Sequence, residues 1–175
     1  MDILAELSAG HSRAITTRIV NYIGSDKVRF AVLMKIFTGD DLRLQQRSAW
    51  AMSDIVVKHP QLIKPFLKNI IPRLRQSGHP AIARNILRIL QFIDLPEKYE
   101  SVVFDDCLRF IKSESTPVAI RAFAVTVAGH ICNKYPELQR ELRPVLRELM
   151  TLQQQPAMSH RIKLVLKAWE RGTQD

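Results

Sequence analysis

The stretch Val118-Ala119-Ile120-Arg121-Ala122-Phe123-Ala124 decides the fold, because an arginine in a similar apolar setting returns at a regular interval along the chain. Arg47, Arg84 and Arg121 are spaced 37 residues apart, and Arg161 follows 40 residues later. A fixed period of about 20–50 residues is typical of stacked repeats, in which each repeat is one supersecondary unit. The spacing therefore predicts a repeat architecture before any single helix is assigned.

The prolines follow the same period and divide each later repeat into two helices. One set precedes the arginines by four or five residues: Pro80, Pro117 and Pro156. A second set opens the other helix of each pair: Pro60, Pro96 and Pro136. Proline suits the first turn of a helix, where its missing N–H would have no partner in any case. Three more prolines fall inside predicted helices, where we expect a kink or an interruption: Pro65, Pro72 and Pro144.

Hydrophobic periodicity predicts an all-α chain and a single domain over residues 1–175. The expected helices cover approximately residues 2–8, 11–23, 25–38, 41–58, 60–76, 80–93, 96–113, 117–134, 137–153 and 156–171. Within 117–134, one apolar stripe recurs with the helical period, and we expect all of it to be buried: Ile120, Phe123, Ala124, Val127, Ala128 and Ile131.

Two-helix units with an arginine early in the second helix resemble HEAT repeats, an armadillo-like family. The resemblance covers roughly residues 25–171, and Arg13 marks a degenerate unit before it. It implies a right-handed α-α superhelix of about four repeats plus a partial N-terminal unit. In that family an aspartate often ends the first helix and faces the arginine, which implies Asp40 or Asp41 as the partner of Arg47; Ser77 and Ser115 stand near the later equivalents. The chain is also similar to small bacterial HEAT-repeat proteins without an assigned activity.

The net positive charge indicates which classes of partner the chain could attract. The chain has 175 residues and a formal net charge of +9, which favours nucleic acid, an anionic membrane surface or an acidic protein. The alternative is a basic solvated surface without a dedicated target, and charge alone does not separate these interpretations. Residues 1–6 lack the basic segment and apolar run of a secretory signal. No apolar stretch reaches the length of a membrane span, so we expect a cytoplasmic protein without membrane insertion.

The basic residues supply the candidate anion- or partner-binding site. Lys64, Lys68 and Arg75 share one face if residues 60–76 form a helix, and Arg73 lies beside them. Arg84 and Arg88 extend the positive field, together with Arg43 and Arg47. By contrast, the stripe Arg140, Arg143 and Arg147 alternates with glutamates, which is typical of a solvated helix face.

The periodic arginines have two interpretations. Each guanidinium either bonds carbonyls and acids at the junction with a neighbouring repeat, or contributes to a row of cations on the concave face. Regular placement at a packing position favours the first interpretation. We therefore expect Arg121 to stabilise the fold.

Trp50 and Asp54 are one helical turn apart, so they share a face. The HEAT-like family of alkylpurine DNA glycosylases resembles this chain in architecture and charge, and it uses aromatic residues and an aspartate in a concave cleft. However, the repeat register aligns Trp50 with Leu87, Ala124 and Leu164, which indicates a core column. We therefore expect Trp50 in the core and no glycosylase activity.

Other catalytic patterns are missing from the sequence. It contains no Gly-x-Ser-x-Gly and no glycine-rich phosphate loop. Cys107 and Cys132 lie in apolar runs as expected for buried reduced thiols, and the five histidines lack metal-ligand spacing, so we expect no metal and no cofactor.

The sequence thus predicts a non-enzymatic binding or scaffold protein that recognises a protein partner through a solenoid surface. The alternative is a basic module that binds nucleic acid through phosphates, and a glycosylase-like enzyme is third. A face with one sign of charge would favour nucleic acid, whereas a mixed-sign face with an apolar groove would favour a protein.

Overall fold

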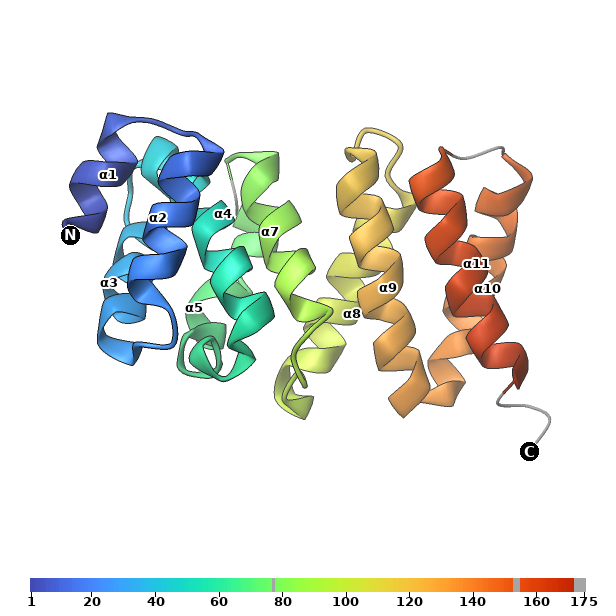
Figure 1. The fold of residues 1–175 in the computed structure, drawn as a ribbon. Helices are drawn as coiled ribbons and strands as arrows, with labels where there is room; N and C mark the ends of the chain where they lie inside the picture. Colours follow the sequence, from blue (N-terminus) through green and yellow to red (C-terminus); the bar gives the residue numbers. More distant parts are fainter. Residues whose placement is uncertain (77, 153–154, 172–175) are drawn as a thin grey trace. The chain divides into compact units, whose positions relative to one another are not determined.

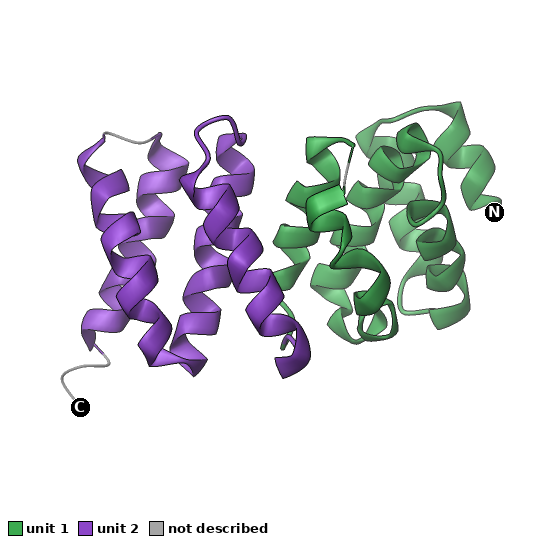
Figure 2. Ribbon diagram, turned by 180° about the vertical axis from the view of Figure 1, so that it is seen from behind, with its two compact units in different colours: residues 1–94 green, residues 95–175 purple. Residues whose placement is uncertain are grey.

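A computed structural model describes residues 1–76, 78–152 and 155–171. These residues form helices and no strand, as the periodicity predicts (Figure 1). The chain divides into two compact units, residues 1–94 and residues 95–175 (Figure 2). The expectation of one domain over the whole chain stays a prediction.

Residues 1–94 form two layers of helices (Figure 1). The second-helix layer consists of α2 (Arg13–Ile23), α4 (Leu42–Lys58) and α7 (Pro80–Leu90), with α4 packed against both others. The first-helix layer consists of α1 (Ile3–Ala9), α3 (Lys27–Phe37), α5 (Leu67–Ile70) and α6 (Arg73–Gln76). In this layer α3 packs against α4, and α6 packs against α7. Each apolar helix face is thus covered by the opposite layer, as repeat stacking requires.

Short polar side chains fix where the first four helices begin. Asp2, Ser12, Asp26 and Asp41 each accept a hydrogen bond from a backbone N–H in the first turn of the helix that follows. These groups satisfy N–H donors that have no partner within the helix. Asp41 therefore caps α4, and the Arg47 guanidinium bonds elsewhere, to the carbonyl oxygens of Leu7 at 2.6 Å and Ser8 at 3.1 Å. The expected pairing of Arg47 with Asp40 or Asp41 is wrong.

The predicted helix over residues 60–76 is broken into four short pieces. These are the 3-10 segments η1 (Pro60–Leu62) and η2 (Lys64–Phe66), followed by α5 and α6. Pro65 lies in η2 and Pro72 lies between α5 and α6. Proline removes an intrahelical hydrogen bond and its ring collides with the preceding turn, so the interruption expected at these two positions is confirmed. A continuous helix face does not exist here.

Residues 95–175 form two further helix pairs. The first pair is α8 (Glu97–Lys112) with α9 (Val118–Lys134). The second pair is η3 (Pro136–Leu138) and α10 (Gln139–Thr151) with α11 (Pro156–Arg171). α9 packs against both α8 and α11, whereas α10 packs against α11. α10 continues through Pro144, and the predicted helix end at residue 153 lies outside the described residues.

The helix α9 shows why the predicted apolar stripe is only part of the core. Ala124 and Ala128 are fully buried, but Phe123 is half-buried, which corrects the expectation for that residue. Because α9 is covered on two sides, Val125 also lies in the core although it is outside the stripe. Gly129 allows the close approach of α11, since a Cβ at that position would lie 2.8 Å from a γ-carbon of Val165.

Candidate binding site

A pocket of about 470 Å³ opens on the second-helix layer of residues 1–94. Its walls come from α2 and α4, and one residue of α7 completes it. The lining residues are Arg13, Thr16, Thr17, Val20, Asn21, Trp50, Asp54, Val57, Lys58 and Arg88. The volume lies within the range of pockets that bind ligands in proteins, about 300–1,000 Å³.

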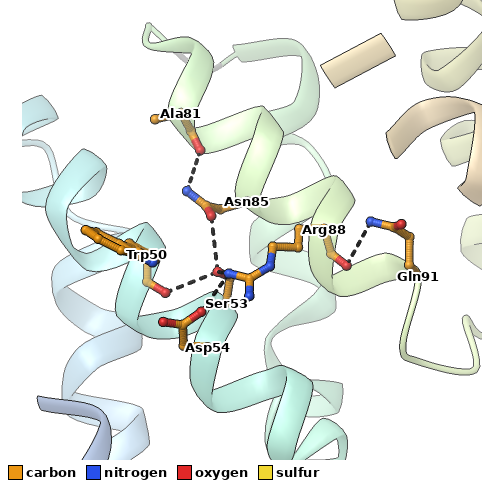
Figure 3. A network of polar contacts seen from close by, with 7 residues as sticks. All are labelled: Trp50, Ser53, Asp54, Ala81, Asn85, Arg88 and Gln91. Carbon is orange, nitrogen blue, oxygen red and sulfur yellow. Dashed lines mark hydrogen bonds and ion pairs between the residues drawn. The ribbon is translucent and has the colours of Figure 1, made fainter. Parts of the chain in front are cut away.

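A polar network holds one wall of this pocket in place (Figure 3). The Arg88 guanidinium donates to Asp54 Oδ1 at 2.6 Å and to Ser53 Oγ at 2.7 Å. Ser53 Oγ also lies 3.1 Å from Asn85 Oδ1, and the Asn85 amide donates to the Ala81 carbonyl at 2.9 Å. Ser53 and Asn85 are buried between α4 and α7, so the network crosses the junction between these helices. Two ionised groups held by buried partners keep a defined position at the surface.

Trp50 lies at the surface of the pocket and not in the core. The side chain is half-buried, and its ring meets the His11 ring edge-on with centroids 5.6 Å apart. Leu87 and Ala124 at equivalent repeat positions are fully buried, whereas Leu164 is 55% exposed. The predicted core column is therefore wrong for Trp50 and Leu164. Repeat alignment assigns equivalent positions, but the neighbours that cover them differ from repeat to repeat.

The pocket carries charges of both signs. Arg13 and Lys58 are exposed and make no hydrogen bond or ion pair within the described part of the chain. Asp54 is the acidic residue of the lining, and Arg88 already neutralises it. Two cations of the lining are thus left without an ion pair among the described residues.

The six basic residues predicted to form the anion site lie in different parts of the fold. Lys64 and Lys68 are exposed on the segment η2–α5 of the first-helix layer. Arg73 is committed to the fold, because its guanidinium donates to the Thr38 carbonyl at 2.5 Å and lies over the Phe37 ring. The break at Pro72 also separates Lys64 and Lys68 from Arg75, so the expected continuous helix face does not form.

The remaining two residues of that prediction lie on α7. Arg84 is exposed and has no hydrogen bond or ion pair among the described residues. Arg88, one turn later, lines the pocket. Of the six predicted residues, the structure therefore places Arg88 in the candidate site and the other five outside its lining.

The periodic arginines do not share one role. Arg47 bonds carbonyls of the last turn of α1, and buried Arg121 donates to the Ile111 carbonyl at 3.2 Å in the last turn of α8. Arg161 donates to Thr126 Oγ1 at 2.7 Å and lies over the Phe123 ring, and burial lowers its pKa. Arg84, by contrast, contacts solvent. Three of the four periodic arginines therefore bond to a neighbouring helix: Arg47, Arg121 and Arg161.

A smaller, more apolar pocket of about 230 Å³ lies between α9 and α11 in residues 95–175. Trp169 lines it, is 3% exposed, donates its indole N–H to Asn133 Oδ1 at 3.0 Å and is covered by the Arg143 guanidinium. Burial lowers the pKa of His130 in the same pocket. The polar groups here are largely bonded to one another, which leaves few for a ligand.

The two cysteine thiols are the next groups that could be reactive. Cys107 and Cys132 are both buried, as expected from their apolar runs. Burial raises the pKa of both thiols, that of Cys132 to about 12, which keeps them protonated and unreactive. Within the described residues, no group of three or more His, Cys, Asp or Glu side chains is arranged to hold a metal ion. The described helices also include none that is long and apolar enough to span a membrane.

The spacing of oppositely charged residues in the sequence indicates one part of the site, which the hydrophobic periodicity alone does not. Asp54 and Arg88 are 34 residues apart, and the same separation joins Glu100 to Lys134, which form an ion pair at 2.7 Å. Opposite charges about one repeat apart lie level on neighbouring second helices or within one helix pair. The pairing of Asp54 with Arg88 could therefore be predicted from spacing, although the open pocket beside it could not.

The fold and the pocket define the chain as an α-helical repeat protein, built from stacked helix pairs. A family model for the HEAT repeat domain matches residues 3–169. The chain therefore belongs to the HEAT repeat family, and the predicted resemblance is confirmed. No curated protein and no solved structure matches it.

Proposed function

We propose that the protein is a non-enzymatic scaffold that binds a partner protein through the pocket on the second-helix layer of residues 1–94. The observation that carries this proposal is the mixed lining of the pocket. Two cations that have no hydrogen bond or ion pair with any described residue stand beside a paired carboxylate, a half-buried indole, and the exposed side chains of Thr17 and Asn21. HEAT repeats typically mediate protein interactions, and the family is generally non-enzymatic.

The charge distribution favours a protein over a nucleic acid. Binding through phosphates uses rows of exposed cations of one sign. Here Arg73 is committed to Thr38 and Arg47 to the end of α1, so both of the candidate rows lose members. Nucleic acid is the alternative partner, and nuclease treatment of a crosslinked adduct distinguishes it from a protein.

The proposal can be tested with a photo-crosslinking amino acid introduced at one position at a time. Thr17 is exposed and lines the pocket, whereas Lys35 is exposed on α3 in the first-helix layer and serves as the matched control. After irradiation in native lysate, we expect a discrete adduct from position 17 that protease removes and nuclease does not. Adducts that nuclease removes, or equal adducts from both positions, would contradict the proposal.

A second candidate function follows from one observation, the exposure of Trp50 and Asp54 in a cationic pocket. A DNA glycosylase needs a carboxylate to stabilise a developing sugar cation and an aromatic face for the base. The 2.6 Å ion pair with Arg88 occupies the Asp54 carboxylate, which argues against this role. We expect the purified protein to release no alkylated base from DNA. Release that Asp54→Asn abolishes would establish an enzyme.

A further inference from the structure

We infer that the pocket between α2 and α4 binds an extended acidic segment of the partner protein, with two acidic side chains four residues apart. This inference rests on the proposed function and specifies its ligand.

The helices α2 and α4 run in the same direction (Figure 1), and residues along both of them line the pocket. On α2 its lining extends from Arg13 to Asn21, and on α4 from Trp50 to Lys58. Eight residues of α-helix span about 12 Å. Trp50 contacts His11, which lies just before α2, so the start of α2 is level with Trp50. Arg13 therefore lies toward one end of the pocket and Lys58 toward the other.

The acidic residues of this unit do not compensate these two cations. Residues 1–94 contain 14 Lys and Arg but 7 Asp and Glu. Three of the acids cap helices, namely Asp2, Asp26 and Asp41, and two form ion pairs with arginines, namely Glu6 with Arg18 and Asp54 with Arg88. Five of the seven carboxylates therefore serve the fold, and Asp54, the acid that lines the pocket, is already paired with Arg88, so the lining itself supplies no anion for Arg13 and Lys58.

The surroundings of the pocket strengthen an ion pair formed there. Trp50 stands at the Arg13 end, and Val20 and Val57 add apolar surface to the walls. Apolar walls remove water from one side of a bound anion, which lowers the local dielectric constant and increases the attraction. A segment that lies in the pocket thus gains more than one that meets the same cations on an open surface.

An extended peptide matches this spacing. Side chains at positions i and i+4 of an extended chain point to the same side and are about 13 Å apart. That distance is close to the rise of about 12 Å along the helices between the level of Arg13 and that of Lys58. The flexible Arg13 and Lys58 side chains span the lateral offset between α2 and α4. The residue midway between them faces the Asp54–Arg88 pair, where a small polar side chain is compatible with both charges. Two adjacent acids reach one cation and leave the other without a partner.

The experiment compares two rhodamine-labelled peptides by fluorescence anisotropy at low salt. One is Ser-Glu-Ala-Ser-Ala-Glu-Ser, with serine midway between the glutamates, and the other has the same composition with its two glutamates adjacent. We expect the spaced peptide to bind at least about fivefold more tightly, and its affinity to fall with added salt as exposed charges are screened. Equal affinities, or binding of neither peptide, would overturn the inference.

Charge-reversal variants locate the binding. Arg13→Glu with Lys58→Glu should weaken the spaced peptide by about tenfold or more, because each attraction becomes a repulsion. Lys64→Glu with Lys68→Glu is the matched control, since it reverses two exposed charges of the same unit on the first-helix layer and should leave the affinity unchanged. Arg13→Gln with Lys58→Gln, checked by circular dichroism for intact helix content, should show an intermediate loss. An equal loss in the control pair would place the peptide elsewhere and overturn the inference.

The outcome separates the inference from the proposed function. If the peptides fail but a crosslinker at position 17 still captures a protein, the pocket binds a different kind of segment and the proposed function stands. A single-stranded DNA dodecamer is titrated in parallel. If it binds more tightly than the peptide and depends on Arg13 and Lys58, the site takes nucleic acid and both proposals fail.

Discussion

The second-helix layers of the two units use their cations in different ways. In residues 95–175, Arg161 lies over Phe123, Arg121 bonds the end of α8, and the α9–α11 junction is tight at Gly129. In residues 1–94, the junction of α2 and α4 is open, and Arg13 and Lys58 are exposed in it. The formal net charge is +7 for residues 1–94 and +2 for residues 95–175. Arg13 and Lys58 of the first unit are thus left exposed, whereas Arg121 and Arg161 of the second unit are used in packing.

Substitution of the two tryptophans should give the largest measurable difference between the two units. Trp169 is buried and its indole N–H is bonded, so Trp169→Ala should lower the free energy of unfolding by about 3–5 kcal/mol. Trp50 is half-buried in an open pocket, so Trp50→Ala should cost less than half of that loss but weaken binding of the acidic peptide. Chemical denaturation and anisotropy measure the two effects. Equal stability losses would remove the distinction between a structural and a ligand-facing tryptophan.

The periodic arginines provide the next largest effect. Arg121 is buried and donates to a carbonyl, so Arg121→Ala should lower the free energy of unfolding by about 1.5–3 kcal/mol. Arg84 at the equivalent position of α7 is exposed, and Arg84→Ala should leave the denaturation midpoint unchanged. Arg140→Ala on the exposed face of α10 is a control of the same kind. If Arg84→Ala destabilises as much as Arg121→Ala, the repeats use this arginine uniformly after all.

Gly129 tests the tight junction of the second unit. A Cβ at this position would meet both γ-carbons of Val165, at 2.8 and 3.0 Å. Gly129→Ala should therefore destabilise by about 1–2 kcal/mol, since overpacking exceeds the gain in helix propensity. Combining it with Val165→Ala removes the γ-carbons, so the two changes should be less than additive in a double-mutant cycle. Full additivity would show that the helices do not meet at this point.

The smallest expected effect concerns the two cysteine thiols, whose titration and alkylation depend on the packing of residues 95–175. Both cysteines lie in residues 95–175, and the pKa of Cys132 is raised to about 12 by burial. Because the folded state holds this proton more tightly than the unfolded state, the thiol favours folding below pH 9 and loses that contribution as the pH rises toward 12. At pH 8 we expect slow alkylation by iodoacetamide, faster in Trp169→Ala and unchanged in Trp50→Ala. Rapid labelling of the wild type would contradict the burial of both thiols.

The helix predictions succeeded where one physical cause dominated. The helix at 117–134 was expected from its apolar period and appears as Val118–Lys134, and the helix at 41–58 appears as Leu42–Lys58. At residues 60–76 the same periodicity competed with Pro65 and Pro72, and the prolines prevailed. Periodicity counts apolar positions, but it does not weigh them against a missing N–H and a steric clash inside the turn.

The site was predicted less well than the fold. Lys64, Lys68, Arg73 and Arg75 were grouped on a helix face that does not form, while Trp50 was assigned to the core. Arg88 was the one residue of the predicted set that lines the pocket. The assigned function of these residues stays a prediction until the peptide and crosslinking experiments are done.

The sequence alone determined the repeat period, the helix pairs and the excess of positive charge. These properties are local or additive: hydrophobic spacing, proline position and residue composition act without knowledge of distant neighbours. The tertiary structure decided which cations bond carbonyls, which tryptophan is covered and where a pocket opens. Those outcomes depend on how closely neighbouring helices approach, because a guanidinium is either enclosed by carbonyls, as Arg121 is, or exposed to solvent, as Arg13 is. That distance is set by packing across repeats, which no single repeat encodes.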